Sequence, residues 1–179
     1  MDIIIEDLNW QRVTHETEIT QSVCQLRNEF HQRCSCVKVG NVVLTAAHCV
    51  PTEKKVKVIF TEKWHRCKKR YYDPYYDIAA LDCGELEYPS ARVAVEYFPG
   101  AIEVVHWNCD WREDVFCDVV KLSSPGEIMK GHKTFYHTAD TLAGSSGAPV
   151  FQDGRLVGIH TSGLEGEYNM GTWIGVIDE

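Results

Sequence analysis

The chain has 179 residues, of which 44% are hydrophobic and 25% are charged, and its formal net charge is −8. This length and composition are typical of a globular protein with one sizeable core or two small fused cores. No apolar run approaches the roughly 18 residues that a membrane-spanning helix needs, which excludes a membrane span.

The first seven residues, Met1 to Asp7, lack the pattern of a secretory signal. Asp2 stands where such a signal carries basic residues, and the apolar run from Ile3 to Ile5 is only three residues long. We therefore expect a cytoplasmic protein.

The first half of the chain is predicted to form short β-strands, because segments rich in β-branched, aromatic or alternating residues are separated by turn residues. Gly40-Asn41 lies between two of these segments and is typical of a tight hairpin. The predicted strands are residues 22–27, 34–39, 42–45, 55–60, 63–70 and 77–82.

Residues 17–31 allow a second interpretation. Ile19, Val23, Leu26 and Phe30 recur at helical spacing, which is typical of an amphipathic helix. We favour a short helical or irregular entry followed by a strand, because the first half otherwise lacks a strand to close a barrel.

The second half is predicted to form a further series of strands, and Asp153-Gly154 indicates another hairpin. The boundary between the halves is expected at residues 89–91, which divides the chain into residues 1–90 and 91–179. The predicted strands are residues 92–97, 102–107, 115–121, 133–138, 148–151, 156–161 and 169–177.

The cysteines leave three interpretations open. Without a secretory signal, free and mostly half-buried thiols are expected, whereas an oxidising compartment would favour four disulfides. Zinc is a third interpretation, because Cys34 with Cys36 and His106 with Cys109 offer paired ligands. A Cys-x-x-Cys pair is missing, which argues against zinc. We expect no metal and no other cofactor. The eight cysteines are at positions 24, 34, 36, 49, 67, 83, 109 and 117.

A basic strip lies within the acidic chain. Residues 54–70 hold eight of the 18 basic residues and a single acidic residue, Glu62. Trp64 and His65 lie inside the strip and tyrosines follow it, so a weak nucleic-acid contact through phosphates and stacking is one interpretation. The other is a solvated strand pair whose charges complement the acidic body.

Three short motifs carry reactive side chains. Residues 45–49 (Thr-Ala-Ala-His-Cys) end a predicted strand, residues 76–81 (Tyr-Asp-Ile-Ala-Ala-Leu) open another, and residues 144–150 (Gly-Ser-Ser-Gly-Ala-Pro-Val) precede a third. A serine becomes nucleophilic when an imidazole accepts its proton, and a carboxylate must fix the tautomer of that imidazole. Glycines beside the serine allow a sharp turn in which two N–H groups point at the developing oxyanion.

In this order the motifs resemble those of trypsin-like serine proteases, over roughly residues 22–177. The resemblance implies an all-β fold of two six-stranded antiparallel β-barrels, with the active site in the cleft between them. It also implies that His48 is the general base, that Asp77 orients it and that Ser146 attacks a polypeptide substrate. The N-terminal barrel, residues 1–90, would carry the first two residues of this triad.

Two further assignments follow from the same resemblance. The amides of Gly144 and Ser146 would form the oxyanion hole. Asp73 and Asp82 compete with Asp77 as the triad carboxylate, and Asp77 is favoured because the apolar residues 78–81 follow it.

The chain departs from digestive trypsins at Ser145, where those enzymes carry an aspartate that pairs with a new amino terminus. Because the chain begins with Met1, we expect activity without zymogen cleavage. These features are similar to those of viral chymotrypsin-like proteases, such as arterivirus and astrovirus proteases, and of bacterial glutamyl endopeptidases. A viral protease would act in the host-cell cytoplasm.

The specificity pocket gives a mixed signal. Family enzymes that cut after Glu or Gln carry a Thr or Ser five residues before the nucleophile and a His on a following strand, and Thr141 and His160 match these positions. Asp140 stands where trypsins bind Lys or Arg, so that specificity stays open as the alternative. Further substrate contacts are expected from Thr161, Ser162 and Gly163.

The sequence therefore predicts a serine endopeptidase that works through an acyl-enzyme and processes a viral polyprotein after Glu or Gln. One alternative is a cellular intracellular trypsin-like protease domain that cuts after Lys or Arg. The other is a catalytically idle protease fold that binds peptide or RNA.

Overall fold

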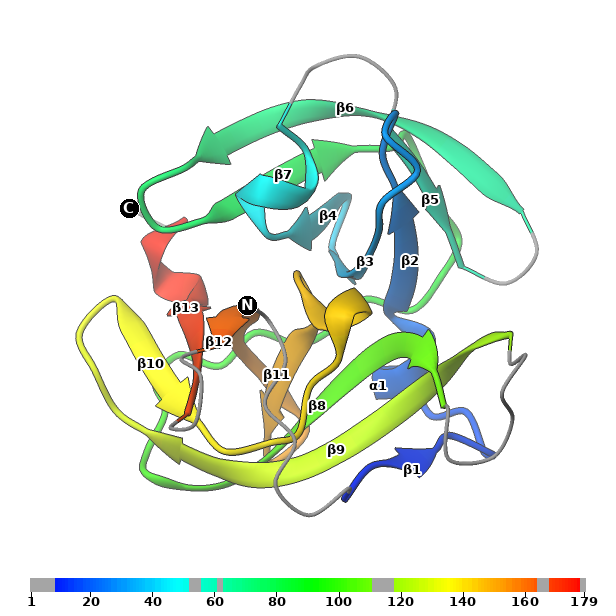
Figure 1. Cartoon of the computed structure of the whole chain (residues 1–179). Coiled ribbons are helices and arrows are strands. Elements are labelled where there is room, and N and C mark those ends of the chain that lie inside the picture. Colours follow the sequence, from blue (N-terminus) through cyan, green and yellow to red (C-terminus); the bar gives the residue numbers. More distant parts are fainter. Residues whose placement is uncertain (1–8, 52–55, 61–62, 111–117, 164–167, 178–179) are drawn as a thin grey trace.

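The computed structural model describes residues 9–51, 56–60, 63–110, 118–163 and 168–177. Two antiparallel β-barrels lie one above the other in Figure 1, the first built from β2 to β7 and the second from β8 to β13. This architecture confirms the predicted fold class. The division of the chain at residue 90 stays a prediction.

The first barrel uses the six strands that the sequence predicts. They close in the order β2-β3-β4-β7-β6-β5, because β5 pairs back with β2. The Gly40-Asn41 hairpin is confirmed by the pairing of Val39 with Val42, and Gly40 has the positive φ of 58° that glycine tolerates. The strands are β2 (Val23–Arg27), β3 (Arg33–Val39), β4 (Val42–Thr45), β5 (Val56–Ile59), β6 (Trp64–Asp73) and β7 (Ile78–Asp82).

The second barrel closes because β8 pairs with both β9 and β11. Its hairpin at Asp153-Gly154 is confirmed, and both residues have positive φ values, 51° and 77°. The strands are β8 (Gly100–Cys109), β9 (Val119–Met129), β10 (Thr134–His137), β11 (Pro149–Gln152), β12 (Arg155–Gly163) and β13 (Asn169–Trp173).

Two strand predictions for the second half are wrong in part. Residues 92–97 form no strand but an extended connection, with a single bridge from Val93 to Leu156. Strand β13 pairs with β12 from Gly158 onward, so the segment meets a free edge of β12 only at Leu156. There the N–H of Ala94 donates to the carbonyl of Leu156, and the N–H of Leu156 donates to the carbonyl of Arg92. The last predicted strand ends at Trp173 and continues as the 3-10 helix η3 (Ile174–Val176). Residues 115–117, also predicted as strand, lie outside the described residues.

The amphipathic helix over residues 17–31 is wrong, and the short helical entry is confirmed. Helix α1 (Glu18–Gln21) begins after Thr17, whose side chain accepts a hydrogen bond from the N–H of Thr20. Strand β2 follows at Val23. Among the described residues, no helix is long and apolar enough to cross a membrane.

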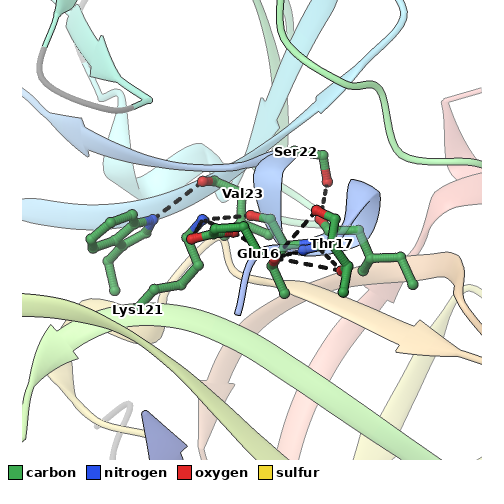
Figure 2. A network of polar contacts seen from close by, with 8 residues as sticks. Glu16, Thr17, Ser22, Val23 and Lys121 are labelled. Carbon is green, nitrogen blue, oxygen red and sulfur yellow. Dashed lines mark hydrogen bonds and ion pairs between the residues drawn. The ribbon is translucent and has the colours of Figure 1, made fainter. Parts of the chain in front are cut away.

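The segment before β2 is docked on the second barrel, although the sequence places it in the first half. Strand β1 (Gln11–Arg12) pairs with β9. Lys121 of β9 contacts Glu16 of this segment (Figure 2), with Nζ 3.0 Å from each carboxylate oxygen. Lys121 Nζ also donates to the carbonyl of Thr20 at 2.6 Å. The Lys121 side chain is only 7% exposed, so this ion pair is nearly buried on one side.

The apolar core runs across the barrel interface. The largest buried cluster combines first-barrel residues such as Leu81 with second-barrel residues such as Phe151 and Ile159. A second cluster around Phe135 fills the second barrel. Because one cluster is shared, residues at the seam between the barrels are held by both cores.

The expectation of mostly free thiols is wrong for this structure. Cys34 is bonded to Cys49, Cys67 is bonded to Cys83, and Cys109 is also disulfide-bonded. Cys24 and Cys36 are free and buried, opposite each other on β2 and β3. Two of the candidate zinc ligands, Cys34 and Cys109, are therefore engaged in disulfides. In the described part of the chain, no group of three or more metal-binding side chains occurs.

Candidate active site

His48 lies in a one-turn 3-10 helix, η1 (Ala47–Cys49), directly after strand β4. Its main-chain position is held from both sides: the next residue, Cys49, is bonded to Cys34, and the N–H of His48 donates to Asp77 Oδ1 at 2.8 Å. The His48 side chain remains 45% exposed. The ring is thus anchored at its base and open to a substrate.

Asp77 contacts the His48 ring as well as its main chain, since Oδ2 lies 2.6 Å from Nδ1. Asp77 sits at a positive φ of 56°, in a turn whose N–H groups at Tyr75 and Tyr76 donate to Asp73 Oδ1. The hydroxyl of Thr172 on β13 donates to the carbonyl of Tyr76. The second barrel therefore helps to hold this turn of the first.

The competing carboxylates have other tasks. Asp73 accepts the turn hydrogen bonds just described, and Asp82 Oδ1 accepts a hydrogen bond from the N–H of Gly84 at 2.9 Å. Asp77 is the carboxylate that contacts His48.

Ser146 completes the constellation from the second barrel. Its Oγ lies 2.9 Å from His48 Nε2. Ser146 follows the 3-10 helix η2 (Ala143–Ser145) and precedes Gly147, which has a φ of +83°. A Cβ at residue 147 would collide with the Thr45 hydroxyl and the Ser35 carbonyl, so the turn requires glycine there.

Ser35 on β3 joins the turn that carries Ser146 (residues 143–147, the serine turn) to both barrels. Its N–H donates to the carbonyl of Ser146 at 2.9 Å. Its hydroxyl accepts from the N–H of Trp107 on β8 at 2.9 Å and donates to the carbonyl of Gly144 at 2.8 Å. Ser35 was not predicted from the sequence, because its contacts join strands that are far apart in the chain.

The two residues proposed for the oxyanion hole, Gly144 and Ser146, lie on either side of Ser145, and the amide of Gly144 is engaged. The N–H of Gly144 donates to Asn108 Oδ1 at 2.6 Å. Ser145 also has a structural task that the sequence did not indicate: its hydroxyl accepts from the N–H of Leu142 at 3.0 Å and from Asn108 Nδ2 at 3.1 Å.

A cavity of about 430 Å³ opens beside Ser146. One wall is formed by His48, Gly144 and Ser146. The remaining lining residues come from the β2–β3 turn region and from β8, β9 and η2: Gln32, Arg33, Cys34, Trp107, Asn108, Cys109, Val119 and Ala143. Thr141 and His160, which are expected to form the specificity pocket, are not among the described residues that line this cavity.

His160 is brought beside the serine turn by main-chain hydrogen bonds. Its carbonyl accepts from the N–H of Gly147, and its N–H donates to the carbonyl of Ala148, both at 2.8 Å. The ring is buried, and His160 Nδ1 lies 3.0 Å from Nε2 of His137 on β10. Burial, with the positive charge that His160 can carry, lowers the pKa of His137 well below its usual range, so His137 stays neutral. His137 was not identified from the sequence.

Thr141 and Asp140 are both buried, but the Asp140 carboxylate has a defined contact. Asp140 is 3% exposed, and its Oδ2 accepts a hydrogen bond from the N–H of Asn9 at 2.8 Å. One side of this acid is therefore turned toward the N-terminal segment. Asn169, another residue missed in the sequence, joins β13 to the same loop by donating to the carbonyl of Ala139 at 2.8 Å.

The remaining predicted substrate contacts lie on β12 after His160. Thr161 is buried, and its hydroxyl donates to the carbonyl of Met170 at 3.2 Å. Ser162 and Gly163 are half-buried and pair with β13. Their contact with substrate stays a prediction.

The basic strip maps to the β5–β6 hairpin of the first barrel. In its described part, Lys57, Arg66 and Lys68 are exposed, which fits a solvated strand pair as well as a nucleic-acid contact. Residues 54–55 and 61–62 of the strip lie outside the described residues. Nucleic-acid binding stays a prediction.

Comparison with known proteins identifies the family. The family description "Trypsin-like peptidase domain" matches residues 33–159. Non-structural polyprotein 1A of human astrovirus-1 is 30% identical over 122 residues, which cover 68% of this chain and 12% of the polyprotein. The chain thus spans about an eighth of the length of that relative.

Solved structures agree in fold. A human pathogenic astrovirus serine protease aligns with a TM-score of 0.70 and 23% identity, over 89% of this chain and 92% of that one. The active form of a protease from M. tuberculosis aligns with a TM-score of 0.75 and 19% identity, over 89% and 79% of the two chains. Two chymotrypsin-like barrels, a serine beside a histidine at their seam and the matching family description lead to one conclusion: the chain belongs to the trypsin-like peptidase family and is a serine endopeptidase.

Proposed function

We propose that His48, Asp77 and Ser146 are the catalytic triad of this endopeptidase. The observation that carries the proposal is the position of the His48 ring, with Nδ1 at 2.6 Å from Asp77 and Nε2 at 2.9 Å from Ser146. A proton on Nδ1 is held by the carboxylate, which leaves Nε2 free to accept the serine proton.

The reaction then proceeds in two halves. Ser146 Oγ bonds to the substrate carbonyl carbon while its proton passes to His48 Nε2. Collapse of the tetrahedral intermediate breaks the peptide bond, and His48 returns the proton to the leaving amine. Water repeats both steps on the acyl-enzyme and releases the new carboxylate. The N–H groups of Gly144 and Ser146 are proposed to stabilise the oxyanion.

For the residue before the cleaved bond we propose Glu or Gln, read by Thr141 and His160. Support comes from the location of His160 beside the serine turn and from the contact of Asp140 with Asn9. A Lys or Arg side chain that bound Asp140 would have to share Oδ2 with the N–H of Asn9. Imidazole and hydroxyl groups can both donate hydrogen bonds to a carboxylate or carboxamide.

The biological role we propose is processing of a viral polyprotein in the host-cell cytoplasm. Support comes from the relatives, which are non-structural polyproteins of human astroviruses. The idle binding module is the competing role, and an aligned Ser146–His48–Asp77 constellation argues against it.

A fluorophosphonate label followed by peptide mapping tests the triad. We expect a single labelled residue, Ser146, and no labelling of a Ser146→Ala variant or of unfolded protein. Labelling that is absent, or that occurs at Ser145, contradicts the proposed nucleophile. A peptide library read by mass spectrometry then tests whether cleavage follows Glu and Gln rather than Lys and Arg.

A further inference from the structure

The main chain of Gly144 is held on both sides by neighbouring side chains. Its N–H donates to Asn108 Oδ1 at 2.6 Å, and its carbonyl accepts from Ser35 Oγ at 2.8 Å. The proposed oxyanion hole needs this N–H. Because an N–H group carries one hydrogen, its bond to Asn108 competes with a bond to the oxyanion.

The orientation of the Asn108 amide is fixed by its other neighbours. Gly144 N–H can only donate, so the amide oxygen must face it. The amide nitrogen then lies 2.6 Å from His106 Nδ1 and 3.1 Å from Ser145 Oγ, both of which can accept. Burial lowers the pKa of His106 to about 3, so its ring is neutral: Nδ1 accepts from Asn108 and Nε2 donates to Ser124 Oγ at 2.8 Å.

The contact between Asn108 and Gly144 is close and sheltered. Asn108 is 6% exposed, and a Cβ at residue 144 would lie 2.5 Å from Asn108 Oδ1. Both residues nevertheless border the cavity beside Ser146. A substrate that fills this cavity therefore reaches the contact, whereas bulk water reaches it poorly.

We propose that Asn108 is a positioning residue that holds the Gly144 N–H until the substrate takes it over, so that the oxyanion hole forms only when the Asn108–Gly144 hydrogen bond breaks. This inference rests on the proposed function. As the Ser146 Oγ–carbon bond forms, the serine proton passes to His48 and the carbonyl electron pair moves onto oxygen. That oxygen replaces Asn108 Oδ1 as the acceptor of the Gly144 hydrogen. Giving up one buried hydrogen bond corresponds to a factor of about 3 to 10 in rate.

Two variants of Asn108 test the proposal, because both lose the side-chain amide donors and only one keeps an acceptor for the Gly144 N–H. Asn108→Ala and Asn108→Asp both lose the donors to His106 and Ser145. Only Asn108→Asp keeps an acceptor for Gly144 N–H, and its charge makes that hydrogen bond stronger. We expect Asn108→Ala to raise the rate constant of fluorophosphonate labelling about 3- to 10-fold and Asn108→Asp to lower it at least about tenfold.

A merely structural role would slow both variants, since both remove support from the serine turn. Rates that fall in both variants, or that stay unchanged in both, overturn the proposal. The labelling must be compared with kcat/KM on two peptide substrates, one extended past the cleaved bond and one that carries only a small leaving group after it. We expect the extended peptide to fill the cavity, so Asn108→Ala should raise kcat/KM less for this peptide than for the shorter one.

Nuclear magnetic resonance on the unaltered protein provides a test that does not depend on a variant's folding. A peptide boronic acid adds to Ser146 Oγ, and a boronate oxygen takes the place of the oxyanion. We expect the Gly144 amide proton and the Asn108 side-chain amide protons to shift together on addition. If the adduct forms while both sets of resonances stay in place, Asn108 does not hold the amide. If fluorophosphonate and boronic acid both fail to react with Ser146, the proposed function itself is overturned.

Discussion

Asp140 Oδ2 accepts a hydrogen bond from the main-chain N–H of Asn9, across 131 positions of sequence. The residue that would select Lys or Arg in a trypsin is thus tied to the N-terminal segment. Specificity should then depend on His160 rather than on Asp140.

The specificity prediction compares two substitutions. His160→Ala should lower kcat/KM on Glu and Gln substrates by about 10- to 100-fold, because one lost hydrogen bond to a buried polar group costs about 1–3 kcal/mol. Fluorophosphonate labelling should persist. Asp140→Asn should leave the preference for Glu or Gln in place while lowering thermal stability. Dominant cleavage after Lys or Arg that disappears in Asp140→Asn would refute the assignment and leave the endopeptidase intact.

Substitution of the proposed triad carboxylate should separate orientation from folding. Asp77→Asn should lower turnover by about 10⁴-fold, as the same substitution does in a chymotrypsin-type triad, because the amide favours the wrong tautomer of His48. Asp73→Asn is the matched control: it weakens the turn formed with Tyr75 and Tyr76, so it should reduce stability more than turnover. Steady-state kinetics and thermal unfolding of both variants decide between them, and a larger turnover loss in Asp73→Asn would reverse the assignment.

Much of the fold follows from the sequence, because the alternation of side chains along a strand and the residues typical of turns are local signals. The six strands of the first barrel and both Gly-containing hairpins were predicted at nearly their observed positions. The error at residues 92–97 has a physical cause, since strand propensity says nothing about whether a barrel still has an open edge.

In the site, the motifs indicate the candidate catalytic residues but not the residues that hold them in place. Ser35, Asn108 and His137 act through contacts that depend on the register between distant strands. Ser145 had no expected role, yet it accepts two hydrogen bonds in the serine turn. Disulfides were an open alternative that we did not favour, because the sequence shows no secretory signal. That Cys34 meets Cys49 and that Cys67 meets Cys83 follows only from the folded chain.

Acid should destabilise the protein before its carboxyl groups titrate. The pKa of His106 is lowered by burial from 6.5 to about 3, and that of His137 is also lowered well below 6.5. Between these values the unfolded state binds more protons than the folded state, so the free energy of unfolding falls as the pH falls. The slope approaches about 1.4 kcal/mol per pH unit for each buried histidine.

Urea unfolding between about pH 6.5 and pH 5 measures this slope, because most carboxyl groups stay charged there. Substitution of the exposed His15 by glutamine is the control and should leave the slope unchanged. A free energy of unfolding that is constant over this range would show that the two histidines are accessible to protons in the folded state.

The cysteines should fall into two classes of reactivity. Burial, with a smaller effect of Cys24, raises the pKa of Cys36 well above its usual value. Because Cys24 and Cys36 are both buried, both thiols should resist alkylation in the folded protein. After unfolding without reductant, peptide mapping should find label on Cys24 and Cys36 but not on Cys34 or Cys67. Labelling of the latter two would mean that their disulfides do not form.

The two residues of the Lys121–Glu16 ion pair (Figure 2) should differ in how much their substitution lowers the free energy of unfolding. Glu16→Ala should cost about 1–3 kcal/mol, because it leaves a nearly buried ammonium with less compensation. Lys121→Met should cost less, since it removes that charge and leaves Glu16 at its partly exposed site. Urea unfolding of both variants measures the difference, and a greater loss in Lys121→Met would show that the ammonium itself stabilises the fold.

The docking of the N-terminal segment on the second barrel also sets an order of events during synthesis. Strands β2 to β7 are complete once Asp82 has left the ribosome, so the first barrel can close early. The contact of Glu16 with Lys121 cannot form until 105 further residues have been made, and that of Asn9 with Asp140 cannot form until 131 further residues have been made. With translation at about 5–20 residues per second, the segment stays undocked for a time on the order of ten seconds. Residues 9–16 are therefore made before the first barrel but are held in place only after it.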